Sequence, residues 1–216
     1  MGQSEPEVRA VIAAERTELA DLLAALPAER WDEETLCAGW RVRETVAHIT
    51  MSFRYSLPRV MFGIIKARGS FNRMADRSAR DDAAKMTPDD LVECIRSNVD
   101  HPWKPPGGGY IGALSHDLIH ELDITVGLGL DRTPPPERVG LVLDSLQPRQ
   151  VAFFDVDLSG VQLRADDLDW SYGTGDPVTG RAQDLLLVVC GRQLPPALLR
   201  GDAAGRFSRS PSNGQP

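Results

Sequence analysis

Apolar side chains recur at helical spacing through the first 130 residues, and this pattern limits what the chain can fold into. In residues 7–26 charged residues separate the members of one apolar face, which are Val8, Ile12, Leu19, Leu22, Leu23 and Leu26. Further helices are predicted over about 41–58, with a continuation to 67 left open, over 88–99, and from 110 to 127 or 129. Four such helices must bury their apolar faces against one another, which predicts a four-helix bundle.

Local signals fix some of the boundaries between these helices. Thr87, Pro88 and Asp90 read as an N-cap hydroxyl, a proline in the first turn and a carboxylate three residues after the cap. The run HPWKPPGGG at 101–109 is predicted to be a loop, because its prolines and glycines sustain neither regular structure. Residues 69–86 are polar and fit either a solvated helix or a loop.

The pattern changes after residue 130. The run DRTPPPE at 131–137 is a stiff, proline-rich linker. Beyond it we expect a helix at 138–147, strands within 151–158 and 161–172, and a helix within 180–192. The chain is therefore expected to be an α+β protein with a helical bundle at 1–130, a small α+β domain at 138–205 and a disordered tail at 206–216.

Composition excludes several classes of partner. The 216 residues include 24 Lys and Arg against 31 Asp and Glu, a net charge of −7, which argues against a nucleic-acid binder. No apolar run approaches the roughly 20 residues of a membrane span, and the acidic opening lacks a secretory signal, so a soluble cytoplasmic protein without a membrane partner is expected. Cys37, Cys94 and Cys190 form no CxxC pair and are expected to be buried thiols.

Two of the four histidines stand four residues apart. His116 and His120 share a helical face, so both rings can bind one ion. His48 lies on an apolar stripe of the second predicted helix and is the candidate for a third ligand. Three nitrogen ligands leave a coordination position open, as in catalytic zinc sites. Taken singly, His48 also fits a hydrogen-bonded core residue, and His101 fits an exposed or structural one.

Asp123 follows His120 by three residues and shares its helical face. It is a candidate to accept a hydrogen bond from a ligand ring, and a solvated carboxylate is the alternative interpretation. Asp117 and Glu121 directly follow the two histidines, so they are expected to turn away from the metal side.

Several motifs together carry a family resemblance. These are Trp31 with the run TLCAGWRVRETVAH at 35–48, Phe71-Asn72, the Pro-Pro-Gly-Gly loop, His116-x-x-x-His120-x-x-Asp123, Leu163-Arg164-Ala165, Val178-Thr179-Gly180 with Asp184, and Gly191-Arg192. In this order and spacing they resemble the DinB-like, mycothiol-dependent maleylpyruvate isomerase family over nearly the whole chain. The resemblance implies a DinB-like bundle followed by the family's C-terminal domain.

The same resemblance implies a divalent metal, usually zinc, held by His48, His116 and His120, and mycothiol as thiol cosubstrate. One departure matters, since the isomerase branch carries a glutamate where His116 stands. Three neutral histidines leave the site at a formal charge of +2, against +1 with a carboxylate, and so favour a bound thiolate or hydroxide. In this respect the chain is similar to the thiol-transferase side of the superfamily.

The implied mechanism begins with a low-molecular-weight thiol, activated as a metal-bound thiolate, that attacks a small electrophile. An isomerase would expel the thiol again after rotation about the former double bond, whereas an S-transferase would release the conjugate. Arg192, at the family's Gly-Arg position, could pair with a substrate carboxylate, and a surface arginine is the alternative.

Two other classes of function stay open. A metal-dependent hydrolase would use the same ligands, and a non-catalytic protein stabilised or regulated by its metal would keep them for folding. The sequence also leaves the oligomeric state open, with a homodimer as one option.

Overall fold

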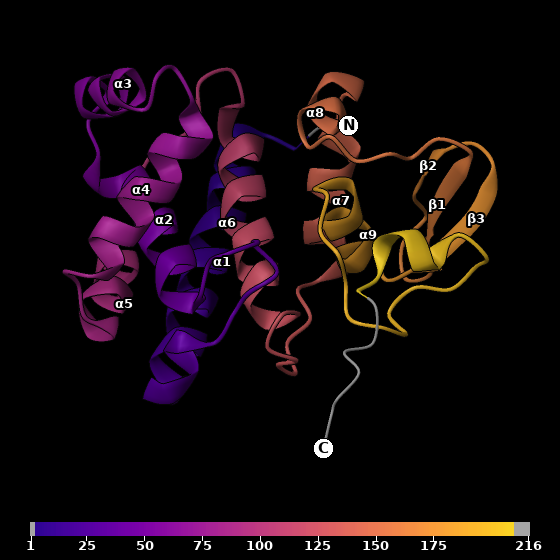
Figure 1. Ribbon diagram of the computed structural model, residues 1–216, viewed down its shortest axis with the longest axis horizontal. Helices are drawn as coiled ribbons and strands as arrows, with labels where there is room; N and C mark the ends of the chain where they lie inside the picture. The colour runs from indigo at the N-terminus through magenta and orange to yellow at the C-terminus, as the bar shows by residue number, and fades with distance from the viewer. Residues whose placement is uncertain (1–2, 210–216) are drawn as a thin grey trace. The chain divides into compact units, whose positions relative to one another are not determined.

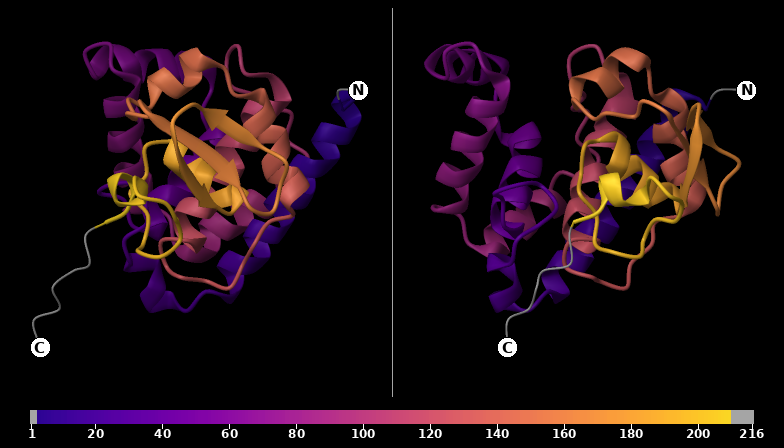
Figure 2. Two further views of the ribbon diagram at one scale, coloured as in Figure 1. Left: turned by 90° about the vertical axis from the view of Figure 1, so that its right-hand side faces the viewer. Right: turned by 45° about the vertical axis from the view of Figure 1, so that its right-hand side comes forward.

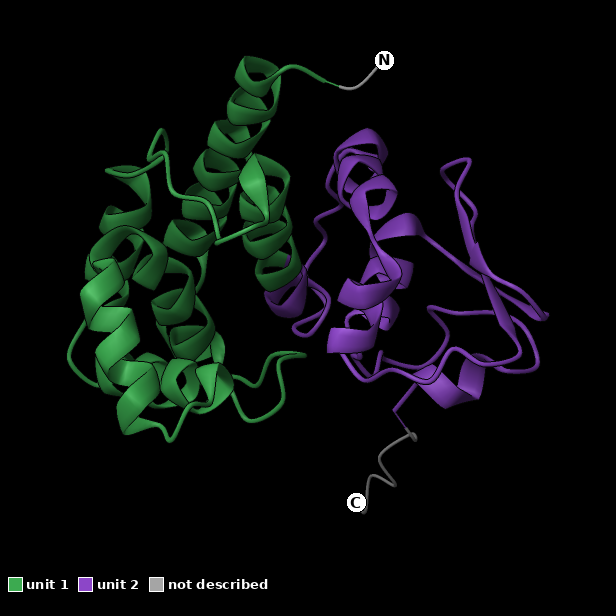
Figure 3. Ribbon diagram, turned by 90° about the horizontal axis from the view of Figure 1, so that it is seen from above, with its two compact units in different colours: residues 1–121 green, residues 122–216 purple. Residues whose placement is uncertain are grey.

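The computed structural model describes residues 3–209, which divide into two compact units, residues 1–121 and 122–216 (Figure 3). The chain is mostly helical with one small three-stranded sheet, so the predicted α+β class is confirmed. The division falls inside a helix, between Glu121 and Leu122, and not at the proline-rich linker. Each unit is described separately.

Six α-helices lie or begin in unit 1 among the described residues, where the sequence predicts four. They are α1 Glu5–Ala25, α2 Val42–Arg54, α3 Leu57–Lys66, α4 Phe71–Ala83, α5 Pro88–Arg96 and α6 Gly109–Thr125 (Figure 1), and a 3-10 turn, η1, covers Ala28–Asp32. Pro58 in the first turn of α3 separates this helix from α2, and the ambiguous polar segment forms α4. The predicted cap of α5 is confirmed, because the Thr87 hydroxyl accepts from the Asp90 amide at 3.1 Å.

The core of unit 1 lies between long helices. The helix α2 packs against α4 and α5, and α1 packs against α5 (Figure 1). Fully buried side chains of α1, α2, α5 and α6 make up this core: Leu19, Leu23, Ile49, Leu91, Ile95, Leu114 and Leu118. The short helix α3 lies at the surface and contains no buried residue, with Ile65 70% exposed. The bundle core is thus built by α1, α2, α4, α5 and α6.

A tight turn over residues 37–40 leads into α2. The Trp40 amide donates to the Cys37 carbonyl at 2.9 Å, and Gly39 has a φ of +78°. A positive φ at the third residue of a turn is the conformation that favours glycine. The Thr35 hydroxyl closes the turn from the other side by donating to the Trp40 carbonyl at 3.0 Å. This turn sets the direction in which α2 leaves.

Unit 2 holds the sheet and the remaining helices. Its elements are α7 Pro136–Ser145, α8 Pro148–Phe153, β1 Val161–Ala165, β2 Ser171–Gly173, β3 Asp176–Gly180, α9 Ala182–Val189 and the 3-10 turn η2 Ala204–Phe207. The strand order is β2-β1-β3, with β1 antiparallel to β2 and parallel to β3. The helix α9 packs against β1 and β3 (Figure 2) and is buried along its whole length.

Two predictions for the C-terminal part are wrong. Residues 151–158 were expected to contain a strand, but Val151 and Phe153 belong to the helix α8. A disordered tail was expected from residue 206, but Arg206 and Phe207 are part of η2 and Phe207 is buried. The rest of the predicted tail, from residue 210, lies outside the described residues.

The described helices include none that combines the length and the apolar character needed to cross a membrane. Of the three cysteines, Cys190 is buried, and burial raises the pKa of its thiol to about 12. Cys37 and Cys94 are half-buried, so the expectation of buried thiols holds fully only for Cys190.

Candidate metal centre

The three histidines that the sequence singled out lie together in unit 1. Each of His48, His116 and His120 offers one ring nitrogen, and these nitrogens all lie within 4.8 Å of one another. The Nε2 atoms of His48 and His116 are 3.3 Å apart. All three side chains are half-buried, so the cluster is reachable from solvent while its surroundings are largely protein.

The positions of the rings follow from two helices. The i and i+4 spacing in α6 places His116 and His120 one turn apart on one face, with ring centroids 5.1 Å apart. The helix α2 buries the neighbours of His48, namely Ala47 and Ile49, and its first turn is fixed by Glu44, whose carboxylate accepts from the Arg41 amide at 2.9 Å. The ring of His48 therefore meets the other two without any irregularity in either helix.

His48 is held in its neutral form. Burial lowers the pKa of its imidazole well below the ordinary value, and the neighbouring His120 and His116 lower it further. A neutral imidazole has a lone pair free for a metal, whereas a protonated ring does not. Within the described residues the Nδ1 atom of His48 is buried without a hydrogen-bond partner.

His116 is oriented by the residue that follows it. Its Nδ1 atom is 2.9 Å from Oδ1 of Asp117, which is fully buried. The sequence predicted that Asp117 turns away from the metal side. Its carboxylate contacts Nδ1, on the edge of the ring opposite Nε2, so the sequence missed the contact with His116 itself. Burial alone would raise the pKa of Asp117, but the hydrogen bond with His116 and the charge of Arg16 outweigh it, so the pKa lies below its ordinary value.

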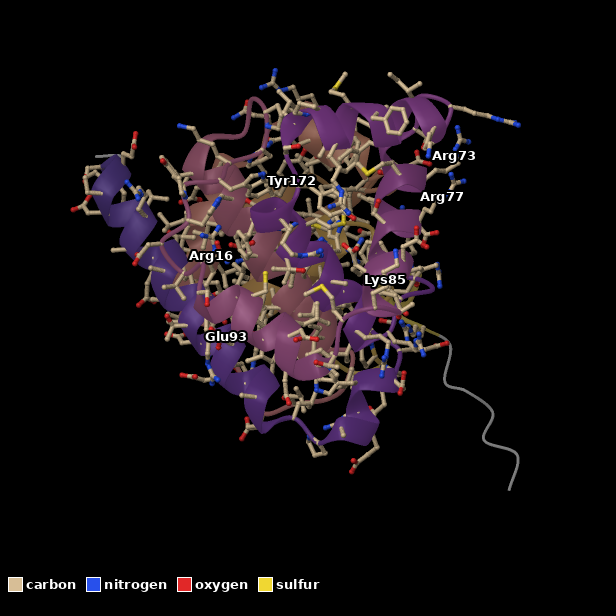
Figure 4. All side chains as sticks on the ribbon, turned by 90° about the vertical axis from the view of Figure 1, so that its left-hand side faces the viewer. Arg16, Arg73, Arg77, Lys85, Glu93 and Tyr172 are labelled. Atoms are coloured by element: carbon tan, nitrogen blue, oxygen red, sulfur yellow. The ribbon has the colours of Figure 1, made fainter. Side chains whose placement is uncertain are left out.

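Arg16 completes this arrangement from α1 (Figure 4). It is 1% exposed, and its Nε donates to Oδ2 of Asp117 at 2.7 Å. Its Nη1 donates to the carbonyl of His101 at 2.9 Å and lies 3.3 Å from the carbonyls of Asn98 and Val99. One guanidinium thus joins α1, the segment after α5, and α6 around the cluster.

Two tryptophans flank the rings. Trp40 lies 5.0 Å from His48 between ring centroids, and Trp103 lies 5.1 Å from His116. The Trp40 indole is fixed because its Nε1 donates to Asp76 of α4 at 2.8 Å. Sequence reasoning assigned no role to Trp103, although an aromatic residue in a proline-rich loop just before the HxxxH helix was the signal that could have found it.

Asp123 and Arg192 form a bidentate ion pair in unit 2. The Arg192 Nε and Nη2 atoms donate to the two Asp123 carboxylate oxygens at 2.7 and 2.8 Å. Asp123 is fully buried, and the Arg192 side chain is 18% exposed. The sequence proposed separate roles for these residues, whereas the structure joins their side chains.

The residues present fit a divalent cation. Zinc–nitrogen bonds of about 2.0–2.1 Å in tetrahedral geometry separate two ligand nitrogens by about 3.4 Å. The Nε2 atoms of His48 and His116 are 3.3 Å apart, close to that separation. The contact of His116 Nδ1 with Asp117 leaves Nε2 as its ligand atom, and an all-imidazole donor set suits zinc and its neighbours in the first transition row.

Fold and site together define a class of protein: a helical bundle with a three-histidine cluster between two of its helices, followed by a small α+β unit. The family profile described as the mycothiol maleylpyruvate isomerase N-terminal domain matches residues 12–101. Over these residues the chain is similar to that family's N-terminal domain. The matched segment contains His48 but ends before His116 and His120.

Two solved structures share the fold across almost the whole chain. The crystal structure of the mycothiol-dependent maleylpyruvate isomerase aligns with a TM-score of 0.61 and 12% identity, covering 94% of each chain. A mutant of that enzyme with one histidine replaced by alanine aligns with the same score and coverage at 11% identity. No curated protein sequence matches the chain.

Proposed function

We propose that the protein is a metal-dependent enzyme that uses a low-molecular-weight thiol, with mycothiol as the expected one, to act on a small electrophile. The observation that carries this proposal is the convergence of three histidine nitrogens within 4.8 Å. The match of residues 12–101 to a family model named for mycothiol chemistry, and a fold similar to a mycothiol-dependent isomerase, support the choice of thiol.

A divalent cation held by His48, His116 and His120 would supply the Lewis acidity that lowers the pKa of a thiol sulfur at the site. The chain itself supplies the donors and their orientation. The neutral ring of His48 presents a lone pair, and Asp117 fixes one edge of the His116 ring. The two indoles, Trp40 and Trp103, give the cluster apolar sides that restrict the approach of water.

Two reactions share the first bond-forming step. The thiolate sulfur adds to one carbon of an electrophilic double bond, and the π electrons move onto the conjugated carbonyl group. Rotation about the new single bond, followed by return of the electrons and loss of the thiolate, gives cis–trans isomerisation. Protonation of the adduct carbon instead gives an S-conjugate, which is the transferase outcome. Because the donor set is made of three histidines, both the isomerase and the transferase outcome are to be tested.

Arg192 is proposed as the residue that pairs with a carboxylate of the substrate, and Asp123 as a residue that supports the site. Because the Arg192 guanidinium already binds both oxygens of Asp123, a substrate carboxylate would have to compete with that buried partner. Arg192→Lys should therefore raise the KM for a carboxylate substrate more than it lowers kcat. An equal fall in kcat with unchanged KM would contradict a role in binding.

The decisive test is metal analysis combined with thiol titration of the purified protein. We expect about one divalent metal per wild-type chain, a change in the cobalt-substituted absorption spectrum on adding mycothiol, and loss of both in His120→Ala. The matched control is Asp82→Asn, which alters a buried carboxylate that accepts from Arg54 and Tyr55 and should keep its metal.

Absence of stoichiometric metal in the wild type would overturn the proposal. Metal without a spectral response to mycothiol would also overturn it, and would favour a hydrolase or a structural metal. Product analysis with a conjugated cis-alkene acid then separates the two reactions, since an isomerase regenerates the thiol and a transferase consumes one equivalent.

A further inference from the structure

We infer that Asp117 and Arg16 are positioning residues that fix the His116 ring with Nε2 turned toward His48. This inference rests on the proposed metal site and assigns a role to two residues that do not bind the metal themselves. It is carried by a continuous set of hydrogen bonds from the ligand ring, through Asp117 and Arg16, to the backbone carbonyls of residues 98, 99 and 101, all within unit 1.

The first link sets the tautomer of the ring. Asp117 Oδ1 lies 2.9 Å from His116 Nδ1, and a carboxylate accepts hydrogen bonds, so the proton of the neutral ring belongs on Nδ1. The lone pair is then on Nε2, the atom 3.3 Å from Nε2 of His48. Without Asp117 the ring would be free to adopt the other tautomer or to rotate about its bond to Cβ.

The second link fixes the carboxylate. Asp117 Oδ2 accepts from Arg16 Nε at 2.7 Å, so one oxygen is held by each neighbour and the carboxylate cannot rotate without losing a bond. The two side chains are 0% and 1% exposed. Burying an ion pair this deeply adds little or nothing to folding stability compared with apolar packing. Its position beside a ligand ring is better explained by orientation of that ring than by stability.

The third link extends the arrangement to the wall of the site. Arg16 Nη1 donates to the carbonyl of His101, and the Trp103 amide is 3.2 Å from the ring Nδ1 of His101. Trp103 is the indole whose ring lies 5.1 Å from His116. The same guanidinium therefore holds both the carboxylate that orients the ligand and the segment that carries the neighbouring indole.

Asp117→Asn and Arg16→Lys test this inference through metal affinity. We expect Asp117→Asn to weaken zinc or cobalt binding by 10- to 100-fold, measured by competition with a chromogenic chelator, as is typical when an outer hydrogen-bond partner is removed. Arg16→Lys keeps the positive charge but removes the planar guanidinium with its several N–H donors. It should cause a smaller loss of metal affinity, together with a shift in the cobalt absorption bands.

Asp82→Asn is the matched control. Asp82 pairs with Arg54 at 2.6 Å and is 6% exposed. The substitution therefore removes a largely buried ion pair of the same unit. The Asp82 carboxylate accepts hydrogen bonds from Arg54 and from the Tyr55 hydroxyl. This variant should lose stability while keeping wild-type metal affinity. Equal affinities for wild type, Asp117→Asn and Arg16→Lys would overturn the inference.

A second measurement separates positioning from general destabilisation. Nitrogen NMR of the histidine rings in the metal-free protein should show His116 protonated at Nδ1 in the wild type and a mixture of tautomers in Asp117→Asn. Identical tautomers in both proteins would contradict the inference even if affinity fell. A wild type without stoichiometric metal would instead defeat the proposed function, and the tautomer measurement would still decide whether Asp117 orients the ring.

Discussion

Asp184 is a carboxyl group buried at the start of α9, and at the scale of single residues it gives a pH-dependent prediction. It is 2% exposed, and its Oδ1 has no hydrogen-bond partner within residues 3–209. Burial raises its pKa from 3.8 to about 6. The folded protein therefore binds this proton more tightly than the unfolded chain. The protonated carboxyl adds to the free energy of unfolding below pH 4, and this contribution is lost as the pH rises through 6.

Asp184→Asn removes this dependence, because the amide does not ionise. The free energy of unfolding of the variant relative to wild type should rise by about 2 to 3 kcal/mol between pH 4 and pH 8, as a shift of about two pKa units requires. Urea denaturation at both pH values measures the difference. Asp144→Asn, at an exposed position of α7, should show no such trend, and a pH-independent difference for Asp184→Asn would contradict the prediction.

The histidine cluster could be predicted from the sequence, but the residues around it could not. The i and i+4 spacing alone places His116 beside His120, and the apolar stripe turns His48 inward. Asp117 was missed because the rule that adjacent helical residues face different sides describes Cα–Cβ directions, and a short carboxylate can bend back across that angle. Arg16 lies about a hundred positions away, and periodicity does not indicate its partner.

Among the elements, the turn before α2 depends on one glycine. Gly39→Ala should lower the free energy of unfolding by about 1 to 2 kcal/mol, because a side chain at φ +78° brings Cβ too close to the following carbonyl. The nearest atom to the added methyl would be 3.5 Å away, so the cost comes from backbone strain and not from a clash. Thermal or urea denaturation followed by circular dichroism measures the loss.

Gly205→Ala serves as the control for that variant. The site has a φ outside the left-handed region and open space around the added Cβ, so its stability should change by less than about 0.5 kcal/mol. Equal effects at the two positions would mean that the loss at Gly39 does not arise from its backbone conformation.

Helices with long apolar stripes were predicted well, and the short apolar run at 151–158 was not. The helix α1 begins within two residues of its predicted start, because its stripe covers about five turns. The segment 151–158 carries a short apolar run that fits a strand and a buried helix equally. Pro148 in the first turn and the Gln147 and Gln150 capping box of α8 were the local signals that favoured the helix.

For the whole molecule, metal binding should be coupled to folding. A cation that binds only the folded bundle stabilises it by about 2.7 kcal/mol at a free concentration 100 times its Kd. For a chain of this length that corresponds to an increase in Tm of about 5 to 10 °C. Differential scanning calorimetry with zinc and with a chelator measures the shift. His120→Ala should show none, and an unchanged Tm in the wild type would contradict the coupling.

At the scale of the whole molecule, the chain is similar to the solved isomerase structure in its fold and much less in its amino-acid sequence. A TM-score of 0.61 over 94% of the chain at 12% identity means that the path of the backbone is retained while most side chains differ. Apolar periodicity survives such divergence, which is why the α+β class was predictable. The individual contacts around the histidines depend on particular side chains, and apolar periodicity does not determine them.

The two tryptophans beside the histidines give the protein a built-in optical reporter. Indole emission is quenched by paramagnetic ions and by nearby charge. The ring centroid of Trp40 lies 5.0 Å from that of His48, and the ring centroid of Trp103 lies 5.1 Å from that of His116. Occupancy of the site by cobalt, and later arrival of a thiol, can therefore be followed by intrinsic fluorescence in the unlabelled chain. The two indoles beside the histidines thus provide a signal for each binding step without any added label.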